Sequence, residues 1–250
     1  MSDTTTSGAS HQPLRIFIGY DHRQPVAYNV LQFSLLRRSS KPLMISPLVL
    51  PTLPMTRQGL TPFTFSRFLV PWLCGYQGWA LFLDIDFLAL DDVSGLFALA
   101  DDRYAAMVSK NEKKFEWASM ILFNCGHPAN RILTPDYVED PQRCRSPHTM
   151  DWLTPEQVGG VPGHWNHLVG YDAPRTDAKL VHYTQGMPIY EETNGSEYRD
   201  AWMAEHKKAN AASSWQELMA RSVHAGKTAD GRIVAKLHPD AVLPPVAANG

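Results

Sequence analysis

Two aspartates stand one residue apart directly after a strongly apolar run, in the stretch GWALFLDIDFLAL (residues 78–90). In an extended chain, residues two apart point the same way, so the carboxylates of Asp84 and Asp86 are expected side by side. Two ionised carboxylates at close range repel each other, and a bridging divalent cation such as Mg²⁺ or Mn²⁺ would relieve that repulsion. The alternative is that both carboxylates cap the next turn and face water, and the D-x-D spacing alone favours this alternative.

The position of the pair in the fold strengthens the metal interpretation. Its apolar run is typical of a central strand that is buried on both faces, and ligands of open α/β sheets bind beyond the carboxyl ends of such strands. Leu14–Gly19 predicts a first strand, the apolar spacing after Pro25 predicts a helix, and residues 42–51 predict a second strand. This order indicates a parallel sheet covered by helices.

The segment before the aspartates predicts another helix. Thr61 is a suitable N-cap and Pro62 a suitable first helical residue, whereas Pro71 should kink or end the helix. Residues 126–164 are rich in Pro, Gly and polar residues and are expected to be mostly loop. The remaining expected elements are strands within 103–110, 119–124 and 179–184, a short helix at 154–158 and a helical tail at 197–224.

The composition limits the classes of function. The 250 residues are 44% hydrophobic, which is enough for a sizeable core. A formal net charge of −2 and a pI near 6.5 argue against a nucleic-acid-binding protein. Three cysteines without metal-ligand spacing favour a reducing, cytoplasmic location. We expect no transmembrane segment, because no apolar run approaches the roughly 20 residues that one needs, and no secretory signal.

The succession TFSRFLVPWLCGYQGWALFLDIDFLALDDVSGLF (residues 64–97) resembles the core of GT-A-fold nucleotide-sugar glycosyltransferases, especially family 8. The resemblance is close over Phe63 to Phe97 and looser from Ile16 to about Tyr190. Functionally undefined bacterial sequences are similar in the segments FSRFLVP and WNHLVG. The resemblance implies an α/β, GT-A-like (Rossmann-like) single domain with a mixed, mostly parallel sheet flanked by helices. It implies a retaining hexosyltransferase that moves a sugar from a nucleoside diphosphate, UDP by family habit, to an acceptor.

In this family, the D-x-D carboxylates and a later histidine hold Mn²⁺, which bridges the donor diphosphate. The resemblance assigns these roles to Asp84, Asp86 and His182, the last in LVHYTQGMPIY (residues 180–190), where Gly186 also corresponds to a donor-binding residue. Met187 replaces the family lysine that contacts the diphosphate.

Arg67 matches the family's donor-facing arginine and is therefore our candidate to neutralise the leaving phosphate. The alternative for Arg67 is a surface ion pair of little energetic weight.

Further site residues follow from the resemblance. Gly19, Tyr20 and Asp21 stand where the family contacts the nucleoside: Tyr20 could stack on the base and Asp21 could accept a hydrogen bond, whereas in isolation this stretch is a turn.

Three later segments depart from or loosely match the family. Trp117 replaces an asparagine that touches the sugar, so it could pack on a sugar face or belong to the core. Asp151 is the second expected catalytic residue, contacting the donor sugar or the acceptor. His164 and His167 flank Asn166, which is expected to fix a turn, and they are either acceptor-side groups or solvated loop residues.

Two other functions remain open. A non-catalytic nucleotide-sugar-binding module would explain Met187 and Trp117. A haloacid-dehalogenase-type phosphatase also has D-x-D after an apolar strand, but nearer the start of its domain. The expected partners are the donor and a glycan, lipid-linked or small-molecule acceptor. The expected divisions are a disordered tail at 1–13, the glycosyltransferase domain at 14–195, a helical extension at 196–225 and a flexible tail at 226–250.

Overall fold

The structure is a computed structural model that describes residues 12–209. The tail predictions for residues 1–11, and those for residues 210–250, lie outside the described residues. Of the helical extension expected from residue 197, the described part is helix α5, Arg199–Ala209.

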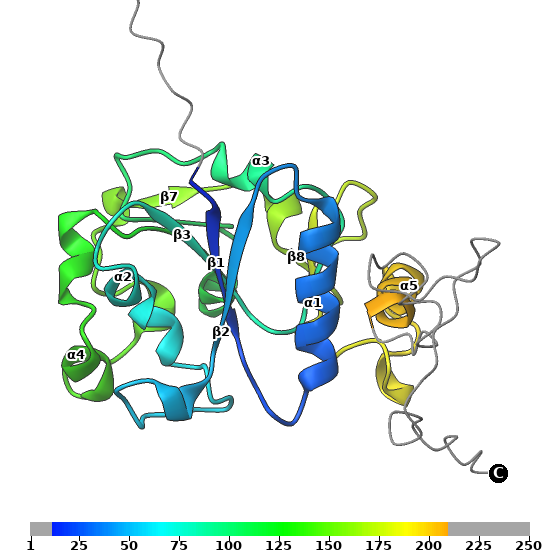
Figure 1. The fold of residues 1–250 in the computed structure, drawn as a ribbon, viewed down its shortest axis with the longest axis horizontal. Coiled ribbons are helices and arrows are strands. Elements are labelled where there is room, and N and C mark those ends of the chain that lie inside the picture. Colours follow the sequence, from blue (N-terminus) through cyan, green and yellow to red (C-terminus); the bar gives the residue numbers. More distant parts are fainter. Residues whose placement is uncertain (1–11, 210–250) are drawn as a thin grey trace, which may run out of the picture. The chain divides into compact units, whose positions relative to one another are not determined.

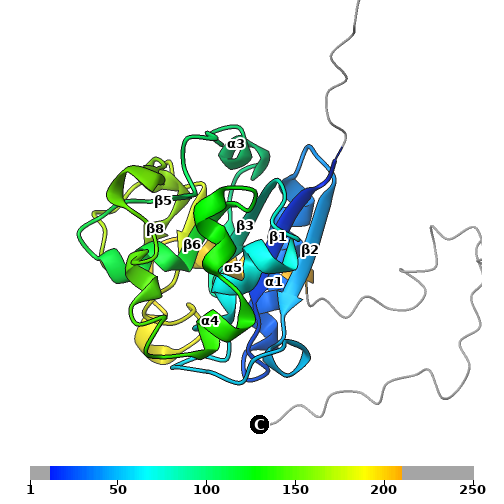
Figure 2. The ribbon, with the colours of Figure 1, turned by 90° about the vertical axis from the view of Figure 1, so that its left-hand side faces the viewer.

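A six-stranded sheet forms the centre of the fold (Figure 1). Its order is β2-β1-β3-β6-β5-β7, and Figure 2 shows β2, β1, β3 and β6 in that order from right to left. Strand β1 is parallel to β2 and β3, β6 is antiparallel to β3 and β5, and β5 is parallel to β7. The mixed, mostly parallel α/β sheet is therefore confirmed. The strands are β1 Leu14–Gly19, β2 Leu43–Leu48, β3 Trp79–Leu83, β5 Ala106–Val108, β6 Met120–Asn124 and β7 Val158–Gly160.

Side chains of β3 enter two hydrophobic cores on opposite faces of the sheet. Ala80 and Phe82 belong to one core, and Leu81 and Leu83 belong to the other. Helix α1, Pro25–Arg38, lies on one side of the sheet, whereas α2, Val70–Leu73, and α4, Pro135–Glu139, lie on the other (Figure 1). Burial on both faces explains why this strand lacks the polar alternation of a half-exposed strand.

A second, three-stranded sheet has the order β4-β9-β8. Strand β4, Phe87–Ala89, is antiparallel to β9, Leu180–His182, which is parallel to β8, His167–Leu168. Phe87 pairs with His182, so Asp86 and His182 stand at the same end of this sheet. The strand expected at residues 179–184 is confirmed, whereas the sequence did not predict β4, β7 or β8.

The helix expected from Thr61 is wrong in its start and type. The chain forms turns up to Phe65, then a 3₁₀ segment, Ser66–Leu69, and one α-helical turn, α2, Val70–Leu73. Pro71 lies in the first turn of α2, where a missing N–H breaks no helical hydrogen bond. It therefore starts this turn and does not end a longer helix.

The loop expected at residues 126–164 contains more structure than the sequence indicated. Helix α4, Pro135–Glu139, begins after Thr134, whose hydroxyl accepts from the Tyr137 N–H at 3.2 Å. The expected short helix at 154–158 is a 3₁₀ turn, Pro155–Gln157, and β7 follows it. A further short helix, α3, Ser94–Phe97, follows β4.

Helix α5 packs against α1. Trp202 is buried, and the Glu205 carboxylate pairs with Arg37 at 2.5 Å and with Arg38 at 2.8 Å. Within residues 12–209, no helix is both long enough and apolar enough to span a membrane.

Candidate metal and donor site

The end of β3, the start of β4 and the end of β9 bring together the three expected metal ligands. One possible ligand atom each from Asp84, Asp86 and His182 lies within 4.8 Å of the other two. The Asp84 N–H donates to the Ser119 carbonyl at 2.9 Å, and the Asp86 carbonyl accepts from the Tyr183 N–H at 3.1 Å. Backbone bonds to neighbouring strands therefore fix both aspartates.

The donor set of this cluster fits a divalent cation. Asp84 Oδ1, Asp86 Oδ1 and His182 Nδ1 are buried. Asp84 Oδ1 is paired with Arg67, whereas His182 Nδ1 has no hydrogen-bond partner. His182 Nε2 lies 3.3 Å from Asp86 Oδ1, and its ring stacks on Phe87 with 4.4 Å between centroids. Carboxylate oxygens with one imidazole nitrogen suit Mn²⁺ or Mg²⁺, so the residues present can hold such an ion.

The electrostatics of the cluster also favour a bound cation. Burial raises the pKa of Asp84 to about 7, against the effect of Arg67. Burial by itself would lower the pKa of His182, but the carboxylates of Asp86 and Asp84 outweigh it and the pKa is raised. The cluster thus retains protons at unusually high pH. Metal ligands bind in their deprotonated forms, so a cation would replace these protons.

Arg67 is a buried residue that holds Asp84. It is 5% exposed, its Nη1 lies 2.9 Å from Asp84 Oδ1, and the same nitrogen donates to the Ala118 carbonyl at 2.7 Å. Its Nε donates to the Thr64 carbonyl at 3.1 Å. A surface ion pair is therefore excluded, and the guanidinium positions a candidate metal ligand.

Glu116 lies near the cluster and was missed by the sequence analysis. Its charge raises the pKa of both Asp84 and His182. Its carbonyl accepts from Ser119 Oγ at 2.7 Å, and Asn166 Nδ2 donates to the same Ser119 Oγ at 3.0 Å. The sequence signal was an acidic residue shortly before β6, but the antiparallel pairing that brings this end of β6 to Asp84 was not foreseen.

The expected nucleoside-binding residues lie at the same edge of the sheet as Asp84, because β1 and β3 are parallel and Ile18 pairs with Leu83. Asp21 is 1% exposed and pairs with Arg23 at 2.6 Å, which lowers its pKa. Tyr20 contacts Tyr28 edge-on, with 5.5 Å between ring centroids.

The ring of Phe63 covers Gly19 so closely that a Cβ at this glycine would overlap it.

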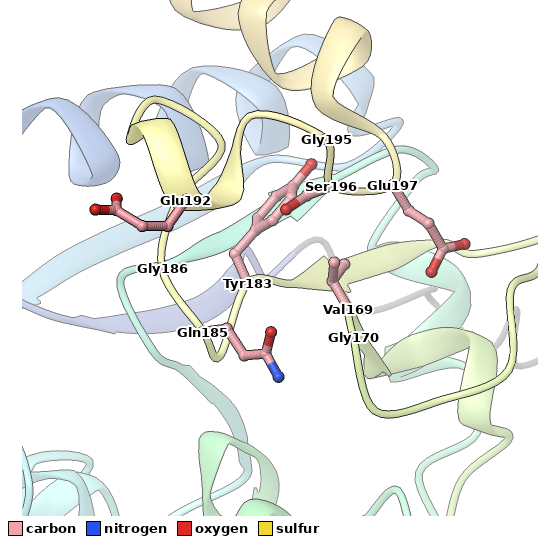
Figure 3. Close-up of a pocket in the computed structure, with 9 residues that line it drawn as sticks. All are labelled: Val169, Gly170, Tyr183, Gln185, Gly186, Glu192, Gly195, Ser196 and Glu197. Carbon is pink, nitrogen blue, oxygen red and sulfur yellow. The ribbon is translucent and has the colours of Figure 1, made fainter.

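The other expected site residues lie in separate surroundings. Trp117 is partly buried, and its Nε1 donates to the Asn111 carbonyl at 3.0 Å. Asp151 accepts from the Ser146 N–H at 2.9 Å and, within residues 12–209, is not part of the Asp84–Asp86–His182 group. Gly186 has a φ of 112° and lines a pocket (Figure 3). Met187 is 3% exposed. Its side chain is uncharged, so this position offers no cation.

The two histidines beside Asn166 differ. His167 is fully buried, which rules out a solvated loop residue. Its Nε2 lies 3.2 Å from Glu197 and its Nδ1 lies 3.6 Å from Asp172. His164 is 24% exposed and lies 3.9 Å from Asp177. Asn166 is buried and contacts the segment before β6, so it does more than fix its own turn.

Comparison with known sequences identifies a family. No protein-family model matches the chain. Protein CDI of Arabidopsis thaliana is 38% identical over 242 residues, which cover 84% of this chain and 92% of that protein. The chain belongs to the family of Protein CDI.

Solved structures show which fold this member of the Protein CDI family has. The bifunctional glycosyltransferase WbbM matches with a TM-score of 0.58 at 14% identity, over 83% of this chain and 51% of WbbM. The glycosyltransferase GlyE of Streptococcus pneumoniae TIGR4 gives 0.60 at 15%, over 78% and 60%. The galactosyltransferase LgtC, in complex with donor and acceptor sugar analogs, gives 0.56 at 12%, over 82% and 99%.

The chain therefore has the GT-A-like fold of glycosyltransferases. It spans about half of WbbM and 60% of GlyE.

Proposed function

We propose that the chain is a metal-dependent glycosyltransferase that moves a sugar from a nucleoside-diphosphate donor to an acceptor. The observation that supports this most strongly is the grouping of Asp84, Asp86 and His182 within 4.8 Å, beyond the carboxyl end of a central strand. The glycosyltransferase fold adds support. The finer parts of the proposal concern the chemistry: Mn²⁺ or Mg²⁺ as the ion, UDP as the nucleotide, and retention of configuration at the transferred sugar. We also propose that the chain is a member of the bacterial branch of family 8 and has a cytoplasmic location.

Asp84, Asp86 and His182 would hold the cation, which supplies Lewis-acid stabilisation of the charge on the leaving phosphate. Arg67 keeps the Asp84 carboxylate in one orientation through a 2.9 Å contact. Because Met187 carries no charge, the cation would supply positive charge at the leaving phosphate. Arg67, which the sequence assigned to the same phosphate, stays a candidate for that role beside its contacts with Asp84 and backbone carbonyls.

Residues around the cluster would bind the rest of the donor. Gly19 ends β1, the parallel strand next to β3, and Tyr20 and Asp21 follow it, and this position supports a role of the three residues in binding the nucleoside. Trp117, Gly186 and Asp151 stay candidates for contacts with the sugar, the diphosphate and the acceptor.

A second candidate function is a module that binds a nucleotide-sugar without transferring the sugar. The observation that favours it is the burial of Met187 where the family has a cation. A phosphatase has less support, because Asp84, its required nucleophile, is enclosed beside Arg67.

The test is thermal unfolding with a panel of nucleoside-diphosphate sugars, with and without Mn²⁺, for the wild type and the Asp84→Asn/Asp86→Asn variant. A donor at a hundred times its dissociation constant stabilises the native state by about 2.7 kcal/mol. We expect one donor to raise the melting temperature only with Mn²⁺, and the variant to lose this rise. The variant Asp101→Asn/Asp102→Asn is the control and should keep it, because Asp102 accepts from Trp79 Nε1 at the opposite end of β3 from Asp84.

An absence of any Mn²⁺-dependent shift, in a folded wild-type protein, would contradict the proposal. Donor binding without transfer to any acceptor and without donor hydrolysis would instead favour the binding module.

A further inference from the structure

Two of the three cysteines contact each other at the end of β3 that is remote from the candidate metal cluster. Cys74 is the C-cap of α2, and Cys125 directly follows β6. Cys125 follows Asn124, which pairs with Trp79 at the start of β3, whereas Asp84 follows the last residue of β3. The two side chains are free thiols that lie close enough to interact directly. The pair is therefore a cluster of nucleophiles that the proposed sugar transfer does not use.

A turn with an unusual backbone joins α2 to β3 and brings Cys74 to Cys125. Within this turn, Gly75, Tyr76 and Gly78 have φ values of 60°, 56° and 62°. Non-glycine residues such as Tyr76 rarely adopt this left-handed region, and they do so where surrounding contacts impose it. The Gly78 carbonyl accepts from the Cys125 N–H at 2.8 Å. A bond between the two sulfurs would thus join segments whose backbones are already held together.

The two thiols differ in how easily a reagent reaches them. Cys74 is partly exposed, whereas Cys125 is fully buried. Arg15 lies beside the turn, where its Nε donates to the Trp79 carbonyl at 3.2 Å and its Nη2 donates to the Gln77 carbonyl. Contact with Cys125, together with the charge of Arg15, lowers the pKa of Cys74, whereas contact with Cys74 and burial raise the pKa of Cys125. An accessible thiolate is the nucleophile in thiol–disulfide exchange, so Cys74 is the group that attacks first.

We propose that Cys74 and Cys125 are a redox-active pair that a small disulfide of the glutathione class converts into a reversible disulfide bond. In the first step, the Cys74 thiolate attacks one sulfur of the reagent, the S–S bond of the reagent breaks, and one thiolate leaves as a mixed disulfide forms. In the second step, the Cys125 thiol gives up its proton, and its sulfur attacks the Cys74 sulfur and displaces the second thiolate. The two protein thiols are oxidised, and the reagent is reduced to two thiols. The inference does not depend on the proposed sugar transfer.

The mixed disulfide at Cys74 also prepares Cys125 for the second step. A negative charge on Cys74 disfavours a second charge on the adjacent sulfur, and contact with Cys74 is the largest cause of the raised pKa of Cys125. The sulfur of a disulfide carries no charge, so Cys125 ionises more easily once Cys74 is modified. Because Cys125 is buried, it reaches the adjacent sulfur of Cys74 more readily than a reagent in solution.

The experiment treats the full chain with an excess of glutathione disulfide and then blocks the remaining thiols with iodoacetamide in urea. Trypsin cuts after Lys and Arg, so Cys74 and Cys125 fall in the separate peptides 68–103 and 115–131. We expect mass spectrometry to find these two peptides joined, and dithiothreitol to release them. Cys144 is the internal reference: it is buried, burial raises its pKa to about 11, and it should be alkylated in full.

Three variants test the order of the two steps. Cys125→Ala removes the second thiol, so the glutathione adduct should accumulate at Cys74. Cys74→Ser removes the accessible thiol, so an adduct at Cys125 should form roughly tenfold more slowly than the Cys74 adduct of Cys125→Ala, because burial restricts access. Cys144→Ser is the matched control and should form the disulfide to the wild-type extent.

The mapping of the wild-type protein decides the inference even if a variant fails to fold. Peptides 68–103 and 115–131 that stay separate and alkylated would overturn it, and so would a reaction that stops at the adduct on Cys74. A disulfide that joins two copies of the chain through Cys74 would also overturn it. Joined peptides in the wild type, together with a trapped adduct at Cys74 in Cys125→Ala, support the inference.

Discussion

At the residue scale, the buried Asp84 carboxylate depends on Arg67 to compensate its negative charge. Removing one partner of a buried ion pair leaves the other charge without compensation and costs about 3 kcal/mol. We expect Arg67→Met to lower the free energy of unfolding by about this amount. Adding Asp84→Asn should recover part of the loss, because the uncompensated charge is then gone. Urea unfolding of the single and double variants measures both effects, and strictly additive losses would contradict the coupling.

The sequence could predict the grouping of Asp84, Asp86 and His182, because strand periodicity and family-like spacing both point to it. It could not predict that Arg67 pairs with Asp84. Its guanidinium reaches Asp84 and the Ala118 carbonyl from a 3₁₀ segment, whose direction differs from that of the expected helix. Glu116 was missed for a related reason, since its nearness to the cluster depends on the antiparallel pairing of β6 with β3.

At the element scale, the ring of Phe63 packs tightly against Gly19 at the end of β1. A Cβ at Gly19 would overlap the ring of Phe63, which is 3% exposed and has little room to move. We expect Gly19→Ala to destabilise the fold by about 2 kcal/mol through overpacking, and Gly19→Ala/Phe63→Leu to be more stable than Gly19→Ala alone. Thermal unfolding of the three proteins checks this. The prediction fails if Phe63→Leu makes the Gly19→Ala protein less stable.

Helix α5 depends on one buried carboxylate for its contact with α1. Glu205 is 2% exposed and pairs with Arg37 and Arg38. Glu205→Gln should weaken these charge-assisted hydrogen bonds by about 2 kcal/mol and speed amide hydrogen exchange in α5 more than in β3. Asp200→Asn, at a side chain that is 98% exposed, is the control. Equal exchange in α5 for both variants would show that packing of Trp202 alone holds the helix.

The elements that the sequence missed are short or depend on distant partners. Strand β8 has two residues and β4 has three, so neither gives a periodic signal. In contrast, α1 was predictable because its buried apolar residues recur at helical spacing, and β1 and β3 were predictable because each is a continuous apolar run of strand length. The prediction that a helix starts at Thr61 was wrong because tertiary contacts of Phe63 and Arg67 override the local helix propensity.

At the scale of the whole molecule, His148 should make the stability of the fold sensitive to acid. It lies among Phe65, Phe68 and Phe115, and burial, with a further effect of Arg67, lowers its pKa to about 3. An unfolded histidine has a pKa of about 6.5, so the unfolded chain binds more protons between these values. Stability should therefore fall as the pH drops below 6.5, with His148 contributing about 2 kcal/mol of loss at pH 5.

The matched variant for this prediction is His148→Phe, which keeps an aromatic ring among the neighbouring rings but cannot titrate. Urea unfolding at pH 7 and pH 5 should show a smaller loss of stability for this variant than for the wild type. His22→Asn changes an exposed histidine and should keep the wild-type loss. An identical loss in wild type and His148→Phe would assign the acid sensitivity to other groups.

The pairing of Phe87 with His182 has a consequence for the order of folding. Asp86 and His182, on the two sides of the candidate metal cluster, are separated along the chain by about half of the described residues. Strand β9 must dock beside β4 before His182 can approach Asp86. During synthesis, a chain that ends before β9 has both aspartates but no third ligand. If the cluster holds the proposed cation, tight binding would require β9 to be in place. The ion would then stabilise chains that include β9 and add little stability to shorter ones.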